Sequence, residues 1–222
     1  MKIENVKACV FDAYGTLFDV NSAAEKCKDK IGDKWEGFAN YWRTTQLEYT
    51  WLRSLMKRHK DFWQVTEDSL DKSMKAFEID YSMRSELLDL YKILSPFKEV
   101  PEVLKSLKEK DLRLAILSNG TPDLLNQLVK NNNLNNLFDD LFSIEEVGIY
   151  KPTSKVYDLP IQKYKIKKNE VAFLSANTWD VSGCGNYGYK SIWVNRNNNI
   201  FDNLDYKPNN EIKNLKELLN II

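Results

Sequence analysis

Short and nearly continuous apolar runs recur along this chain, and turn-forming residues follow them. The first covers residues 6–11, the second covers residues 112–117, and two further runs cover residues 171–174 and 191–194. Runs of this length are typical of strands that are buried on both faces of a parallel sheet. Because helical segments alternate with strands between residues 98 and 194, we predict a parallel α/β sheet.

The segment from about residue 21 to residue 96 has a different pattern. Its apolar residues, such as Leu47 and Trp51, recur at helical spacing, and it contains no convincing strand. Open α/β sheets bind ligands at the carboxyl ends of their strands, so helices inserted after the first strand can fold over that edge as a cap. The predicted domains are an α/β core of residues 1–18 and 98–222 and a helical cap of residues 19–97.

Composition and charge are those of an ordinary globular protein, with 43% hydrophobic and 29% charged residues. A chain of 222 residues can bury roughly 70% of its unfolded surface without disulfide support. Lys+Arg and Asp+Glu both number 32, which indicates neither nucleic acid nor an acidic membrane as a partner. Since no signal peptide or membrane-spanning apolar run is present, we expect a cytoplasmic protein.

The basic run and the cysteines add little chemistry. Residues 57–60 lie on a helix-like pattern, so we predict a solvated helix face there. The run contains His59, which is the only histidine and cannot be half of a His-based metal site. The three cysteines form no CxxC pair, and a buried inert thiol is the default for Cys9 in its apolar strand.

Polar side chains that could carry chemistry come directly after the first two predicted strands. Backbone N–H groups of the turn after the first strand can surround the Asp12 carboxylate, which can then act as a nucleophile. An Asp at a strand end is more often a helix cap or a turn former. Ser118 and Asn119 precede a predicted helix that starts near Thr121, and they suit an anionic substrate group. Alternatively, these two residues only make the turn.

Two more candidates lie later in the chain. Lys151 precedes a proline in a predicted loop, where a lysine is usually on the surface. In a cleft it would orient a carboxylate nucleophile and keep it ionised. Asp180 follows the strand predicted at residues 171–174, and on its own it would be interpreted as a helix N-cap.

Together these segments resemble, in order and spacing, the haloacid dehalogenase superfamily, and the resemblance spans the whole chain. Its first motif normally reads Asp-x-Asp, and the second Asp is the general acid of phosphatases; here Tyr14 takes that place. The fourth motif normally offers an acidic Mg²⁺ ligand near the position of Ser175. Magnesium prefers carboxylate ligands, so we expect no metal and no other cofactor. The same replacements are the rule in the (S)-2-haloacid dehalogenase branch, which implies a Rossmann-like core with a helical cap.

The predicted cap supports this branch. Residues 41–53 closely resemble the cap segment of the branch, whose arginine matches Arg43. Read alone, Arg43 would more often be a solvated helix residue, because Arg is seldom buried unpaired. Phe62 resembles the aromatic wall of the branch, although core packing explains an aromatic residue there equally well. The chain departs from the family at three pocket-lining or neighbouring positions: Thr44, Ala176 and Thr178.

The resemblance implies hydrolysis of small (S)-2-haloacids to (R)-2-hydroxyacids with inversion, through an ester on Asp12. The implied partners are a small haloacid substrate and the released halide, with a homodimer as the family expectation. The catalytic residues carried over from the family are Asp12, Thr16, Arg43, Ser118, Lys151, Tyr157, Ser175, Asn177 and Asp180. The substrate-binding residues carried over are Tyr14, Arg43, Thr44, Leu47, Phe62, Ser118, Asn119 and Trp179.

Three other functions stay open from the sequence. A metal-dependent phosphatase needs a proton donor for the leaving group, and tyrosine, with an ordinary pKa of about 10, is a poor donor near neutrality. A catalytically silent protein used for binding is disfavoured because every expected active-site side chain is present. A dehalogenase-like protein could also act on a ligand that carries no halogen.

Overall fold

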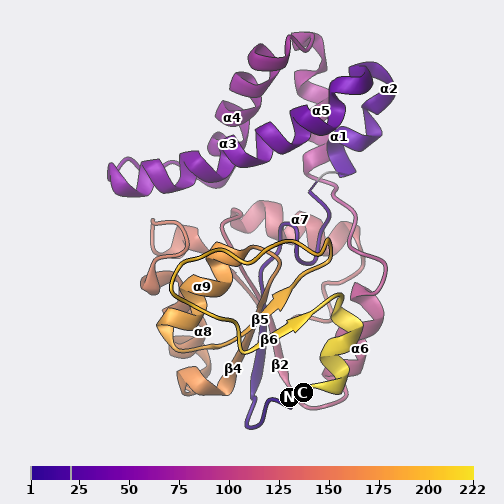
Figure 1. The fold of residues 1–222 in the computed structure, drawn as a ribbon. Helices are drawn as coiled ribbons and strands as arrows, with labels where there is room; N and C mark the ends of the chain where they lie inside the picture. Colours follow the sequence, from indigo (N-terminus) through magenta and orange to yellow (C-terminus); the bar gives the residue numbers. More distant parts are fainter. Residues whose placement is uncertain (1, 21) are drawn as a thin grey trace.

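In the computed structural model, which describes residues 2–20 and 22–222, an α/β core lies beneath a helical cap (Figure 1). The described residues form a six-stranded sheet in the order β3-β2-β1-β4-β5-β6. All neighbouring strands in it are parallel. The strands are β1 Ala8–Phe11, β2 Arg113–Ser118, β3 Asp140–Ser143, β4 Val171–Ser175, β5 Lys190–Val194 and β6 Asn210–Ile212.

The prediction that the apolar runs form buried strands is confirmed for the central strands. Every residue of β1 and β4 is buried, as expected for strands that are covered on both faces. Val10 in β1 pairs with Ala115 on one side and with Phe173 on the other. This register brings the carboxyl ends of β1, β2 and β4 to one edge of the sheet. The candidate catalytic residues come directly after these strand ends.

The structure adds two strands that the apolar pattern does not predict. Asp140 and Leu141 in β3 are only half-buried, and β6 is three residues long with one buried side chain. Both strands lie at the outer edges of the sheet. Edge strands are paired on one side only, so they need no continuous apolar run.

Helices of the core cover the sheet (Figure 1). The predicted helix after β2 is confirmed as α7, Pro122–Asn131, and the Thr121 hydroxyl caps it by accepting from the Leu124 N–H at 3.3 Å. The chain ends in the 3₁₀ helix η5, Leu215–Asn220. The other core helices are α6 Val100–Lys108, η3 Ile144–Glu146, α8 Ser154–Tyr164, η4 Lys168–Glu170 and α9 Thr178–Tyr187.

The cap is helical and is inserted after β1, as predicted (Figure 1). Its elements are α1 Ser22–Lys26, α2 Lys28–Ile31, η1 Gly32–Lys34, α3 Trp35–Leu55, α4 Phe62–Phe77, η2 Tyr81–Met83 and α5 Arg84–Tyr91. None of the described helices is long and apolar enough to cross a bilayer. The boundaries at residues 18 and 98 stay a prediction.

The basic run at residues 57–60 is not on a helix, which corrects the sequence prediction. Lys57 has a φ of 55°, a left-handed conformation that ends α3, and Asp61 then caps α4. The run therefore forms the turn between α3 and α4, and this turn contacts the core. Tyr150 donates to the Lys60 carbonyl at 2.6 Å, and His59 Nε2 lies 2.9 Å from a Glu145 carboxylate oxygen.

Candidate active site

The Asp12 carboxylate is the centre of a buried polar cluster just beyond the end of β1. Its side chain receives hydrogen bonds from three other segments of the chain, and the residue is only 6% exposed. Oδ2 accepts from Thr16 at 3.0 Å, from Asn177 at 2.8 Å and from Ser175 at 3.3 Å. Oδ1 lies 3.1 Å from Lys151 Nζ. One oxygen is thus held by neutral donors, while the other faces a cation.

Lys151 lies between two carboxylates. The residue is 1% exposed, so the common position of a loop lysine on the surface does not apply here. Its Nζ is 3.1 Å from Asp12 and 2.8 Å from Asp180 Oδ2. Burial opposes the charge of Lys151, but the two carboxylates outweigh it and raise its pKa above the ordinary value. The side chain therefore remains an ammonium group.

Asp180 is fully buried in the first turn of α9 and does not cap that helix, because Asn177 occupies the N-cap position. Its Oδ1 accepts from the Tyr157 hydroxyl at 2.6 Å. Burial, together with the nearby Asp12 carboxylate, raises the pKa of Asp180 to about 6, against the opposite influence of Lys151 and Tyr157. A carboxylate with a pKa near neutrality is suited to accept a proton from water.

The turn after β2 contributes Ser118 and Asn119. Ser118 is fully buried, and its Oγ accepts from the Gly120 N–H at 3.0 Å. Asn119 Oδ1 accepts from the Lys151 N–H at 3.2 Å. Both residues thus shape the turn, as the simpler interpretation had it. Their remaining donors, a hydroxyl hydrogen and an amide NH₂, are still available to an anionic ligand.

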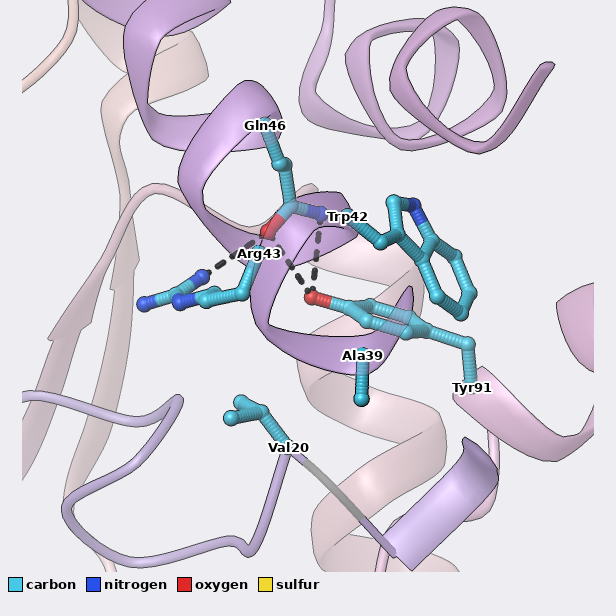
Figure 2. A pocket seen from close by; sticks show the side chains of 6 residues that line it. All are labelled: Val20, Ala39, Trp42, Arg43, Gln46 and Tyr91. Carbon is cyan, nitrogen blue, oxygen red and sulfur yellow. Dashed lines mark hydrogen bonds between the residues drawn. The ribbon is translucent and has the colours of Figure 1, made fainter. Parts of the chain in front are cut away.

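Arg43 lies on α3 in the cap, half-buried, and lines a cavity next to α5 (Figure 2). Its Nη1 donates to Gln46 Oε1 at 2.8 Å. The residues that line the cavity are Val20, Ala39, Trp42, Arg43, Gln46 and Tyr91. We did not predict Gln46 or Tyr91 from the sequence. The available signal was spacing, since Gln46 follows Arg43 by three residues and therefore lies on the same helix face.

An aromatic cluster joins the core to the cap beside this cavity. The Tyr14 ring lies 5.2 Å from Phe62, the first residue of α4, and 5.6 Å from Tyr91. Tyr14 and Phe62 are both buried. Burial raises the pKa of Tyr14 well above the ordinary value, so its hydroxyl remains neutral. The cluster gives the site an apolar wall.

The other predicted pocket residues are more exposed. Leu47 is half-buried on α3. Trp179 is half-buried at the start of α9, and its ring meets the cap residue Trp51 edge-on at 5.4 Å. Thr44 is exposed and is not among the residues that line the Arg43 cavity. The role of Thr44 at the pocket stays a prediction.

The donor set at Asp12 does not fit the Mg²⁺ site of the wider superfamily. At the second acidic position of the first motif, the Tyr14 ring is packed among other aromatic rings. At the fourth motif, the Ser175 hydroxyl donates to Asp12. The described residues contain no cluster of three or more His, Cys, Asp or Glu that could hold a metal ion. Magnesium needs several hard oxygen ligands, and the second buried carboxylate of the cluster, Asp180, is engaged by Lys151 and Tyr157.

Comparison with known proteins assigns the family. Residues 6–188 match the family of haloacid dehalogenase-like hydrolases. The chain is 38% identical to an (S)-2-haloacid dehalogenase of Pseudomonas sp. (strain YL), over 99% of this chain and 95% of that protein. A haloacetate dehalogenase H-2 of Moraxella sp. (strain B) is 33% identical over 99% of both chains. The chain therefore belongs to the (S)-2-haloacid dehalogenases of the haloacid dehalogenase superfamily.

Solved structures of dehalogenases are similar to this chain over nearly its full length. The L-2-haloacid dehalogenase of Xanthobacter autotrophicus with chloropropionic acid covalently bound has a TM-score of 0.90 and 32% sequence identity, and the match covers 97% of each chain. A second crystal structure, described as a dehalogenase with intermediate complex, has a TM-score of 0.97 and 33% identity over 99% of this chain and 98% of the other.

Proposed function

We propose that this chain, as a member of the (S)-2-haloacid dehalogenase family, hydrolyses small (S)-2-haloacids to (R)-2-hydroxyacids through an ester on Asp12. The observation that carries the proposal is the pair of buried carboxylates, Asp12 and Asp180, on either side of Lys151. One carboxylate serves as nucleophile and the other as base. The covalent chloropropionate adduct of the Xanthobacter autotrophicus relative supports the ester step.

In the first step, Asp12 Oδ1 attacks C2 of the substrate. Oδ2 is engaged by three neutral donors, which leaves Oδ1, beside Lys151, as the freer oxygen. A new C–O bond forms as the carbon–halogen bond breaks, and the halide leaves with the bonding electron pair. Because attack comes from the side opposite the halogen, the carbon centre is inverted. Exclusion of water beneath the cap favours this step, since a desolvated carboxylate is a better nucleophile.

The substrate carboxylate binds at the turn after β2 in this proposal. Ser118 and the nearby backbone N–H groups hold the carboxylate, and Arg43 with Asn119 stabilises the departing halide. A guanidinium group remains charged at any working pH, so it attracts the halide as negative charge develops. The aromatic wall of Tyr14 and Phe62, together with Leu47 and Trp179, surrounds the apolar part of the acid.

In the second step, water attacks the ester carbonyl carbon of Asp12 while Asp180 accepts a proton from that water. The ester C–O bond at the carbonyl breaks, and the leaving alkoxide oxygen takes the remaining proton of the attacking water, while Asp180 returns its proton to solvent. The hydroxyacid leaves with its C2–O bond intact, so the inversion is kept. Asp12 is regenerated as a carboxylate that contains one oxygen from water. Lys151 and Tyr157 hold Asp180 at 2.8 and 2.6 Å and so fix the base.

Halide release from the two enantiomers of 2-chloropropionate, measured with a chelator present, tests this function. We expect release from the (S) form only, complete loss in Asp12→Ala, and normal release in Asp33→Ala, which changes an exposed cap residue. Equal rates for both enantiomers, or loss of activity with the chelator, would contradict the mechanism. A single turnover in H₂¹⁸O should place ¹⁸O in Asp12 before it reaches the product.

We also propose that the protein is a homodimer that uses the second half of α3. Leu55 is 79% exposed there, and Met56 and Leu52 beside it are also exposed. Contiguous exposed apolar side chains commonly mark protein interfaces. Light scattering after gel filtration should give a dimer for the wild type and a monomer for Leu55→Glu. A wild-type monomer would contradict this proposal.

We further propose a cytoplasmic location. It is supported by the three cysteines, Cys9, Cys27 and Cys184, which are free and buried, since cytosolic proteins keep their thiols reduced. Fractionation of the source cells tests this, and recovery of the protein outside the cytoplasm would contradict it.

A further inference from the structure

We infer that Gln46 is a positioning residue for Arg43, because its side-chain carbonyl fixes the guanidinium group in the orientation that receives the departing halide. The inference rests on the proposed function, in which Arg43 binds the halide. Figure 2 shows the arrangement, with Gln46 between the guanidinium group on one side and the Tyr91 hydroxyl on the other.

The first observation is the partner of Arg43. Gln46 is 1% exposed, one helical turn beyond Arg43, and its Oε1 accepts from Arg43 Nη1 at 2.8 Å. In the described part of the chain, no carboxylate lies within salt-bridge distance of Arg43. A neutral amide orients the guanidinium group without cancelling its charge. The full positive charge of Arg43 therefore remains available to an anion.

The second observation is that the orientation of the Gln46 amide is determined by its neighbours. The Thr66 hydroxyl donates its single hydrogen to the Phe62 carbonyl at 2.7 Å. Thr66 Oγ1, which lies 2.7 Å from Gln46 Nε2, must therefore accept from Gln46. The second hydrogen of Nε2 points to the Tyr91 hydroxyl at 3.1 Å. Both amide hydrogens are thus used, and Oε1 accepts from Arg43 at 2.8 Å and, more weakly, from the Tyr91 hydroxyl at 3.4 Å.

The opposite amide orientation is excluded on the same grounds. A flipped Gln46 would turn its NH₂ group toward the guanidinium group of Arg43, which has only donors. Its oxygen would face Thr66, whose hydrogen is already donated to Phe62. A buried polar network with one allowed arrangement is rigid. The donors of Arg43 are thereby placed before charge develops on the halide, which is the condition for effective electrostatic stabilisation.

Gln46→Leu tests the inference, with Gln64→Leu on the exposed face of α4 as the matched control. In single turnovers on (S)-2-chloropropionate, we expect the Gln46 variant to release halide roughly 10- to 100-fold more slowly, which is typical of a misplaced catalytic group. Hydrolysis of the ester, once formed, should proceed at the wild-type rate. Gln64→Leu should match the wild type in both steps.

Three further variants separate positioning from packing. Thr66→Val removes the hydroxyl that orients Gln46 and should slow halide release in the same direction, whereas Thr66→Ser should restore the wild-type rate. Gln46→Glu keeps nearly the same shape but places a carboxylate on Arg43, so it should weaken chloride binding to the resting protein. Broadening of the ³⁵Cl NMR line measures that binding without turnover.

The outcomes distinguish this inference from the proposed function. The inference is overturned if Gln46→Leu releases halide at the wild-type rate, or if both steps slow equally while chloride binding is unchanged. If the wild type releases no halide from either enantiomer, but Gln46→Leu still weakens chloride binding relative to Gln64→Leu, the function fails and the positioning of Arg43 by Gln46 stands.

Discussion

At the scale of single residues, the most consequential contact is the one that Lys151 makes with two carboxylates. A buried ammonium group is unfavourable unless it is paired, and here it is paired twice, with Asp12 and with Asp180. The two buried carboxylates in turn depend on Lys151, because among the described residues it is the one cation that pairs with both of them. Removing that cation leaves two like charges without a neutralising charge.

Lys151→Met should therefore destabilise the protein as well as inactivate it. Loss of one partner from a buried ion pair costs about 3–5 kcal/mol. We expect the loss in free energy of unfolding to be larger at pH 8 than at pH 5.5, because at the lower pH Asp180 can take up a proton. Urea denaturation at both pH values measures this. Lys155→Met, on the exposed side of α8, is the control, and an equal loss in both variants would contradict the prediction.

Asp180 should titrate near pH 6 in the resting protein rather than near pH 4. Burial, with the help of Asp12, raises its pKa to about 6, so the carboxylate is lost as the pH falls through that value. ¹³C NMR of aspartate carboxyl groups measures this titration, with Asp180→Asn to assign the signal. A midpoint near 4 would show that the environment of Asp180 differs from the one described above.

At the scale of elements, the helix caps decide where pocket residues lie. The Asp61 carboxylate accepts from the Gln64 N–H at 2.8 Å and so starts α4 at Phe62, which packs on Tyr14. A capping residue outside the pocket therefore fixes the entry of an aromatic wall residue. The same type of bond at η2, from the Ser82 N–H to Asp80, serves no pocket residue.

Asp61→Ala should lower the free energy of unfolding by about 1 kcal/mol, as expected for loss of an N-cap. We also expect KM for (S)-2-chloropropionate to rise, because Phe62 loses its fixed position at the pocket wall. Asp80→Ala removes a similar bond elsewhere in the cap and should leave KM unchanged. Steady-state kinetics of the two variants make the comparison, and a similar KM in both would contradict it.

The burial of each strand decides whether it can be predicted from the sequence. The central strands β1 and β4 are predicted because burial on both faces requires continuous apolar residues. The edge strands β3 and β6 are not predicted, because strands paired on one side only can mix polar and apolar residues. Asp12 and Lys151 stand in recognisable motifs. Gln46 does not, because a buried glutamine at helical spacing has no signature until its partners are known.

At the scale of the whole molecule, the cap is held on the core by contacts around the α3–α4 turn. Tyr150 donates to the Lys60 carbonyl, and the ring of His59 lies 5.3 Å from the Tyr150 ring. Near the end of α3, Trp51 meets Trp179 of α9 in the core. These contacts link cap and core at points outside the cluster of Asp12. They are therefore placed to control how often the cap lifts from the core.

Tyr150→Phe should make the cap open more often. A lost hydrogen bond of this kind costs about 1 kcal/mol, which corresponds to roughly a fivefold rise in the open population. Limited trypsin digestion at the basic residues 57–60 should accelerate by a similar factor in the absence of substrate. Tyr81→Phe, an exposed tyrosine of the cap, is the control. Unchanged digestion of Tyr150→Phe would show that the turn opens independently of this bond.

The shared cation also has a consequence for the order of events in catalysis. While Asp12 is a carboxylate, its negative charge helps to keep the pKa of Asp180 high. Ester formation removes that charge, because it departs with the halide, and Lys151 then has Asp180 as its sole ionic neighbour in the cluster. The pKa of Asp180 therefore falls after the nucleophile has reacted, which makes Asp180 a weaker proton acceptor but leaves it more fully ionised. Ester formation thus ensures that Asp180 is a carboxylate when water attacks.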